Sequence, residues 1–215
     1  MPIAELQSRL QSCYELDLPY RVEDFLTTDR DLARALDGEH AHQPRERLLL
    51  QESGDELSMS LYLDAELLDG FRDSGSLAGT GRHQFADLSL VLEGVSHFVY
   101  MAWCAGHERE VSLLELELQA EVDKFVTLLL LQAENDQYGI AELHRWLFED
   151  VHFAETLDDE QRQRYVTANR FAARYCWMLG QDFRRRQDRQ HWYKELRRFY
   201  RLQHDAKLRR ITALQ

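Results

Sequence analysis

Four side chains able to ligate a metal ion fall at helical spacing in the middle of the chain. Glu93 and His97 are four residues apart in one apolar segment, and Glu117 and Glu121 are four apart in the next. Residues four apart share a helix face. Di-metal helical bundles hold iron or manganese with glutamates and histidines from facing helices, leaving coordination positions open. One alternative is therefore a metal-dependent helical-bundle enzyme of the di-iron or manganese carboxylate type.

The spacing departs from such sites, because they carry Glu-x-x-His twice and this chain has a single Glu-x-x-x-His. Two other interpretations stay open for the same residues. The polar stripes could be solvated edges of mostly buried helices. They could instead form a buried network, which needs a partner because an unpaired buried carboxylate is costly. The partners available further along the chain are Arg170, Arg174 and Asn169.

A second group is basic and aromatic and lies near the C-terminus. Arginines contact phosphates or carboxylates, and aromatic rings stack on unpaired bases or fill pockets on a protein partner. The aromatic residues fall at helical spacing, which favours packing against protein over stacking on bases. The residues expected to bind a partner are Arg189, Trp192, Tyr193, Arg197, Arg198, Tyr200 and Arg201.

Catalytic motifs are absent from the sequence. It has no glycine-rich phosphate loop, no Gly-x-Ser-x-Gly elbow and no His-Glu-x-x-His helix. We therefore expect a protein that is not an enzyme and holds no cofactor, with iron or manganese belonging only to the metal alternative.

Two long apolar segments would position the first group. Residues 85–105 predict a helix with a narrow polar arc that includes Glu93 and His97. Residues 111–132 predict a helix with two opposite apolar faces, expected to be covered on both sides. Two polar edges separate these faces, one with Glu115, Gln119 and Asp123, the other with Glu117, Glu121 and Lys124.

The rest of the chain predicts further helices and one small sheet. Alternating apolar residues around a glycine turn predict a β-hairpin at about residues 45–64. Helical patterns cover residues 3–12, 29–36, 139–148 and 156–179, with Gly180 as a kink or stop, and a last helix begins near residue 187. The expected fold is mainly α: a single-domain helical bundle with one β-hairpin and a basic C-terminal helix. Residues 1–186 form the acidic helical domain, and 187–215 form the basic helix, packed on the same domain.

Charge is divided unevenly along the chain. The net charge is −12, but residues 181–215 hold eleven basic against four acidic residues, so this segment is +7 and the first 180 residues are −19. Such asymmetry favours a charged partner. The acidic body would also repel a polyanion, which makes RNA or single-stranded DNA binding through the last helix a second alternative only.

Compartment and membrane signals are also informative. Cys13, Cys104 and Cys176 are odd in number and far apart, which fits a reducing cytoplasm. The N-terminus shows no secretory signal, and a membrane span at 88–105 would place Glu93 and His97 in lipid. We expect a cytoplasmic protein without a membrane partner. It would bind another protein, or a second copy of itself, as a regulator, adaptor or assembly factor, through the basic helix or an acidic groove.

Overall fold

The computed structural model describes residues 1–37, 45–54, 56–73, 82–135, 139–151, 157–185 and 189–214. These residues form two compact units. Unit 1 comprises residues 1–11 and 17–109, and unit 2 comprises residues 12–16 and 110–215. The first helix, α1 (Ile3–Tyr14), contributes its first three quarters to unit 1 and its last turn to unit 2.

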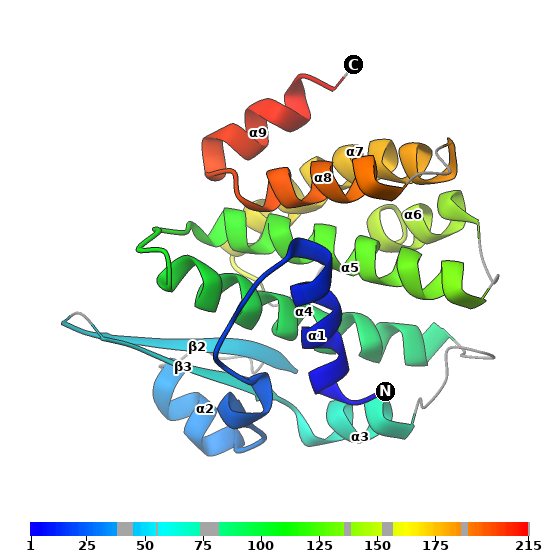
Figure 1. Ribbon diagram of the computed structural model, residues 1–215. Coiled ribbons are helices and arrows are strands. Elements are labelled where there is room, and N and C mark those ends of the chain that lie inside the picture. The colour runs from blue at the N-terminus through cyan, green and yellow to red at the C-terminus, as the bar shows by residue number, and fades with distance from the viewer. Residues whose placement is uncertain are drawn as a thin grey trace. The chain divides into compact units, whose positions relative to one another are not determined.

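Unit 1 combines a small sheet with helices. After α1 come a 3₁₀ turn η1 (Val22–Phe25), β1 (Leu26–Thr27), α2 (Arg30–Asp37), β2 (Glu46–Ser53), β3 (Glu56–Leu63), α3 (Ala65–Asp73) and α4 (Arg82–Ala105). The strand order is β1-β3-β2. β2 and β3 form the predicted antiparallel hairpin, drawn side by side in Figure 1, and the short parallel strand β1 adds a third strand that was not predicted.

The two faces of this sheet pack against different helices. Leu49 and Tyr62 on one face form a small apolar cluster with Ala33 of α2. On the other face, Glu46 and Leu61 contact α4 at Gly94, where a Cβ atom would lie 2.8 Å from Leu61 Cδ1 and 2.9 Å from Glu46 Cγ. The glycine therefore lets the sheet approach the middle of a long helix, although glycine weakens a helix by roughly 1 kcal/mol.

In the part of the chain that the structure describes, unit 2 is a bundle of five helices together with the last turn of α1. The helices are α5 (Leu113–Asn135), α6 (Ile140–Phe148), α7 (Asp159–Arg185), α8 (Arg189–Tyr200) and α9 (His204–Thr212). α5 packs most extensively against α7, which also contacts α6, α8 and α9. A mainly α fold with a small β element is thus confirmed, while the domain division at residue 186 stays a prediction.

Helix α5 is buried around its whole circumference from Glu115 to Leu129, apart from half-buried Glu121. Leu118, Val122 and Phe125 of one predicted apolar face are buried, and so are Leu116 and Ala120 of the other. The prediction that both apolar faces are covered is confirmed. The polar side chains between them are buried too, so they cannot be solvated edges.

Two predicted helix ends are wrong. α7 does not stop at Gly180 but continues to Arg185. The glycine instead makes room for Ile140 and Phe125, which a Cβ atom at this position would meet at 2.5 and 3.2 Å. The single C-terminal helix is two helices, since the chain leaves helical geometry between Tyr200 and His204, with Gln203 in extended conformation as the cap of α9. The predicted start at Thr156 lies outside the described residues. Asp158 caps α7 instead, exchanging side-chain to backbone hydrogen bonds with Gln161.

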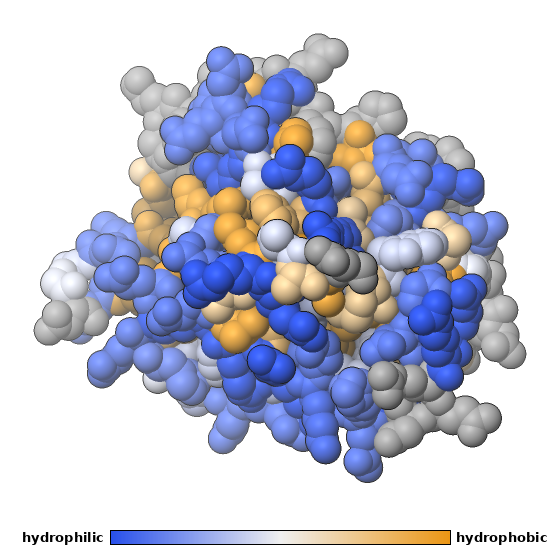
Figure 2. Space-filling view, turned by 90° about the horizontal axis from the view of Figure 1, so that it is seen from above, coloured by the Kyte–Doolittle hydropathy of each residue, from blue (hydrophilic) through white to orange (hydrophobic). Residues whose placement is uncertain are grey.

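One segment of the described chain is long and apolar enough to cross a membrane, residues 85–105 of α4. Most of it is buried within the fold, as in the interior helix of a soluble protein. The face drawn in Figure 2 carries mainly hydrophilic residues, with hydrophobic residues showing between them. The chain therefore has the character of a soluble protein.

Candidate functional site

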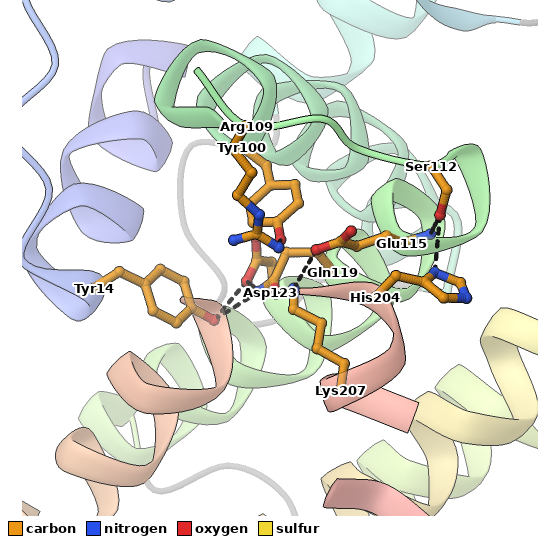
Figure 3. A network of polar contacts seen from close by, with 9 residues as sticks. All are labelled: Tyr14, Tyr100, Arg109, Ser112, Glu115, Gln119, Asp123, His204 and Lys207. Carbon is orange, nitrogen blue, oxygen red and sulfur yellow. Dashed lines mark hydrogen bonds and ion pairs between the residues drawn. The ribbon is translucent and has the colours of Figure 1, made fainter. Parts of the chain in front are cut away.

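A buried chain of polar side chains runs through unit 2 along the predicted edge Glu115, Gln119 and Asp123 of α5 (Figure 3). Lys207 Nζ of α9 donates to Gln119 Oε1 at 2.6 Å, and Gln119 Nε2 donates to Asp123 Oδ1 at 2.8 Å. The hydroxyl of Tyr14, in the last turn of α1, donates to the same Asp123 oxygen at 2.5 Å. The amide of Gln119 thus links a cation to a carboxylate, with every donor facing an acceptor.

Lys207 is the cation of this network and is fully buried. Its Nζ lies 3.8 Å from Glu115 Oε1, and it sits 5.2 and 5.9 Å from the ring centres of Phe199 and Tyr200. A buried lysine needs a carboxylate partner and further hydrogen bonds to offset its desolvation. Glu115 and Gln119 supply them, and the two aromatic faces add cation–π attraction.

The network is closed to solvent. Tyr14, Gln119 and Lys207 are 0% exposed, Asp123 is 1% and Glu115 is 2%. A substrate cannot reach these groups in this conformation, so the arrangement is suited to holding α1, α5 and α9 together. The outer end of the network lies at the start of α5. There Ser112 Oγ accepts a hydrogen bond from the backbone N–H of Glu115 and lies 2.8 Å from His204 Nδ1.

Burial also keeps two cysteine thiols of unit 2, Cys13 and Cys176, in the protonated form. Burial, followed by the charge of Asp123, raises the pKa of the Cys13 thiol far above its ordinary value, against a smaller lowering by Arg197. Burial likewise raises the pKa of Cys176, with Glu121 and Asp123 adding to the effect. Thiols held in the protonated form are poor nucleophiles and poor metal ligands.

The second predicted edge of α5 is also paired inside unit 2. Glu117 Oε1 lies 3.9 Å from Arg164 Nε of α7, and Lys124 Nζ donates to Glu121 Oε1 at 2.8 Å. The predicted partners Arg170 and Arg174 make other contacts in the described residues. Arg170 lies over Phe171, and Arg174 bonds the backbone carbonyls near the C-terminus. Arg164, which lies on the same helix five residues before Asn169, is the arginine that pairs with Glu117.

The other two predicted metal ligands lie on α4 in unit 1. A ligand atom of Glu93 and one of His97 lie within 4.8 Å of each other, as expected for positions four apart on a helix. Because Glu117 and Glu121 belong to unit 2, the four-residue metal set stays a prediction. Within unit 1, β2 adds a residue that sequence reasoning missed: Glu46 Oε1 lies 3.4 Å from His97 Nδ1. In the sequence, Glu46 is marked only by being a charged residue at the start of β2, followed on the same face of the strand by Leu48 and Leu50.

Arg109 follows the end of α4 and covers an aromatic pair of unit 1. Its Nη2 donates to the Tyr100 hydroxyl at 3.0 Å, and its guanidinium lies 5.7 and 5.5 Å from the rings of Tyr100 and Trp103. Figure 3 draws Tyr100 and Arg109 as sticks. The two rings attract the guanidinium by cation–π interaction. Arg109 reaches them because the chain turns back after α4 at Glu108, a residue with φ of 50°.

Three of the predicted partner-binding residues on α8 have internal roles. Trp192 is buried, with Nε1 donating to the Leu179 carbonyl at 3.0 Å, and Tyr200 is buried against Tyr14 with ring centres 4.1 Å apart. Arg189 lies over the Phe183 ring and donates to the Phe183 carbonyl. Trp192 and Tyr200 are thus core residues of unit 2, and Arg189 closes the start of α8.

Two further arginines, Arg197 of α8 and Arg201 just after it, cap α1. Arg197 Nε donates to the Cys13 carbonyl at 3.1 Å, and Arg201 Nη2 donates to the Tyr14 carbonyl at 3.0 Å. Arg197 also pairs with Glu15 at 2.7 Å, where the helix ends in a left-handed residue with φ of 52°. Cations at a helix C-terminus satisfy its last carbonyls and its dipole.

The outer side of α8 keeps a basic character. The exposed side chains that recur every three to four residues along it are His191, Lys194 and Arg198, called here the basic face of α8. Tyr193 is half-buried beside it. Glu195, the one acidic residue of α8, is engaged by Arg210 of α9 at 2.9 Å. Of the predicted binding residues, Arg198 therefore lies on a solvent-facing cationic surface, whereas Arg201 is exposed but bonded to the end of α1.

Comparisons with known proteins identify no relative: no family model, curated protein or solved structure matches this chain.

Proposed function

We propose that the protein binds an acidic surface of another protein through the basic face of α8, and that it is a non-catalytic cytoplasmic regulator, adaptor or assembly factor. The observation that carries this proposal is the division of α8 into two sides. Its aromatic residues turn inward, while His191, Lys194 and Arg198 are exposed. A cationic surface on a protein of net charge −12 attracts a carboxylate-rich partner and orients its approach.

The same division weighs against nucleic acid as the partner. Proteins that bind single strands combine cations with exposed aromatic rings on which bases stack. Trp192, Phe199 and Tyr200 are buried in unit 2, and only Tyr193 keeps part of its ring at the surface. Phosphate contacts alone would have to overcome the charge of −19 on the first 180 residues. An acidic protein segment needs no stacking platform and fits the surface better.

The experiment reverses charge on the basic face. The variant Lys194→Glu/Arg198→Glu changes the local charge by four at two exposed positions. Arg162→Glu/Arg170→Glu is the matched control, because it makes the same change at two exposed positions of α7. Partners are captured from extract of the source cells with each form and quantified by mass spectrometry. Self-association is followed by sedimentation.

The expected result is a partner, or a second copy, retained by the wild type and by the α7 control and lost at least tenfold by the α8 variant. The same partner should dissociate as salt is raised, because the contact is electrostatic. A partner set unchanged by the α8 variant would remove this face from consideration. Binding of a mixed oligonucleotide at low salt, weakened only by the α8 variant, would replace the acidic protein by nucleic acid.

A further inference from the structure

Helix α7 of unit 2 has a second stripe of side chains on the side away from its buried residues, called here the outer face of α7. Its exposed or half-buried members are Arg162, Val166, Arg170, Ala173, Arg174 and Trp177. Two of them are large and apolar, with Val166 41% exposed and Trp177 45% exposed. A large apolar side chain gains free energy when it leaves water. The outer face of α7 is therefore suited to being covered by a partner.

The spacing along this face matches contact with another helix. Val166, Arg170, Ala173 and Trp177 follow one another at intervals of four, three and four residues. This is the spacing of the seam along which two helices pack lengthwise. α7 is one helix from Asp159 to Arg185, so Arg162 and Trp177 lie roughly 22 Å apart along its axis at about 1.5 Å per residue. The face thus offers a helical partner several turns of contact.

Positive charge surrounds the apolar side chains of this face. Residues 161–181 contain four arginines and no acidic residue. Arg170 lies over the Phe171 ring at 5.4 Å, and Arg174 donates to the Thr212 carbonyl at 3.1 Å. Both of these partners are neutral, and among the described residues no carboxylate pairs with Arg170 or Arg174. The two charges are therefore available to an acidic partner.

Trp177 is held in position although its ring is exposed. The ring centre lies 5.2 Å from that of His144 on α6, in edge-to-face geometry. His144 is fixed in turn, because its Nε2 lies 2.8 Å from the Ala173 carbonyl oxygen. A ring that is already held loses little conformational freedom on binding. The indole N–H has no acceptor among the described residues, so it can donate to a carboxylate of the partner.

We propose that the outer face of α7 binds an amphipathic helix of another protein that carries acidic residues beside its apolar stripe. Charge complementarity selects this partner, because its carboxylates would face Arg162, Arg170 and Arg174. A second copy of the same face would bring arginines against arginines. The site is independent of the basic face of α8, and it combines tryptophan with arginine, the residue types that contribute most at protein interfaces.

The probe is a synthetic peptide of about 21 residues in three heptads, with leucine at positions a and d, glutamate at e and g, and alanine elsewhere. The control peptide has lysine in place of glutamate. Each is titrated into the full chain while tryptophan emission is recorded. The acidic peptide should shift the emission to shorter wavelength, because Trp177 leaves water, and added salt should weaken its binding. The lysine peptide should cause no shift.

Substitutions assign the contact to α7. Trp177→Ala and Arg162→Glu/Arg170→Glu should each weaken binding of the acidic peptide at least tenfold, measured by fluorescence anisotropy of labelled peptide. Leu113→Ala, which removes another exposed apolar side chain of unit 2, should bind as the wild type does. Lys194→Glu/Arg198→Glu should also bind normally, so that this site and the basic face of α8 are tested separately.

Circular dichroism checks that each variant is folded. If Trp177→Ala unfolds, the arginine variant decides, because both of its positions are exposed. No saturable binding by the wild type, or equal binding by the folded α7 variants, would overturn the site. Loss of binding in the α8 variant alone would also overturn it and assign the peptide to the basic face of α8. Binding of phosphatidylserine vesicles but not of the peptide would replace the helical partner by a lipid surface.

Discussion

Both units bury ionisable side chains, yet their clusters are built differently. In unit 2, Lys207, Gln119 and Asp123 are joined by hydrogen bonds of 2.6 and 2.8 Å, and Lys207 faces the Glu115 carboxylate. In unit 1, Glu46 Oε1 lies 3.4 Å from His97 Nδ1, and Gly94 leaves room for the Glu46 side chain beside α4. The first cluster joins side chains from three helices by short hydrogen bonds, and the second joins a strand to a helix through a longer polar contact.

This difference indicates unequal contributions of the two clusters to stability. Completed buried networks specify one packing arrangement and are costly to interrupt, because each member depends on the others. The contact between Glu46 and His97 is longer, and hydrogen bonds weaken with distance. Removing one member should therefore cost more stability in unit 2 than in unit 1.

The largest effect should follow from Lys207→Ala. This substitution leaves the Glu115 carboxylate buried without its cation and removes a hydrogen bond from Gln119, so we expect a loss of about 3–5 kcal/mol in the free energy of unfolding. Urea denaturation followed by circular dichroism measures it. Lys194→Ala, an exposed lysine on α8, is the control and should change stability by less than about 0.5 kcal/mol. A loss below about 1 kcal/mol for Lys207→Ala would contradict the completed-network interpretation.

Alkaline pH should destabilise the protein through the buried thiols of unit 2. Cys13 and Cys176 have pKa values raised above the ordinary 9.0 in the folded state, mainly by burial. Above about pH 9 the unfolded chain loses these protons while the folded chain keeps them, so stability falls by about 1.4 kcal/mol per pH unit for each thiol. Below pH 8 both states hold the protons and this effect vanishes.

Urea titrations between pH 8 and 10.5 test this prediction. The double variant Cys13→Ala/Cys176→Ala should start less stable, because small cavities form, but should lose stability less steeply as pH rises. Equal slopes for the wild type and the variant would show that the thiols do not ionise differently in the two states.

The smallest effect, and the one that sharpens the comparison, should come from Gly94→Ala. Alanine is the better helix former by roughly 1 kcal/mol, but its methyl group would overlap Leu61 and Glu46, at a cost of about 1–3 kcal/mol. We expect a net loss of about 1 kcal/mol, measured by thermal unfolding. Gly70→Ala in α3 is the matched control, since its Cβ would meet only the movable carboxylate of Asp87. A stabilised Gly94→Ala protein would show that Glu46 is not held in place by the glycine.

Much of the secondary structure could be predicted from local patterns. The apolar periodicity of 85–105 and 111–132 predicted α4 and α5 to within a few residues, and alternation around Gly54 predicted the hairpin. The same patterns failed at Gly180 and at Gln203. At Gly180 a contact with Ile140, distant in sequence, overrides the breaking tendency of glycine. At Gln203 no proline or glycine marks the turn between α8 and α9.

The candidate sites were predicted in part. The two polar edges of α5 were recognised, but their partners Tyr14, Lys207 and Arg164 were not, because partners from other helices leave no local periodicity. The arginines in and just after α8 were recognised as functional candidates, but Arg197 and Arg201 cap the end of α1. The pairing of Glu46 with His97 joins residues 51 apart and has no short-range signal.

By itself the sequence determined which segments are helices, which faces are apolar and how charge is distributed along the chain, because these depend on residues within one or two turns. Only the tertiary structure decided which polar groups meet. Burial forces each charged or hydrogen-bonding group to find a partner, and that partner is set by packing between distant segments. Lys207 on Gln119 and Glu46 beside His97 are two outcomes of that requirement.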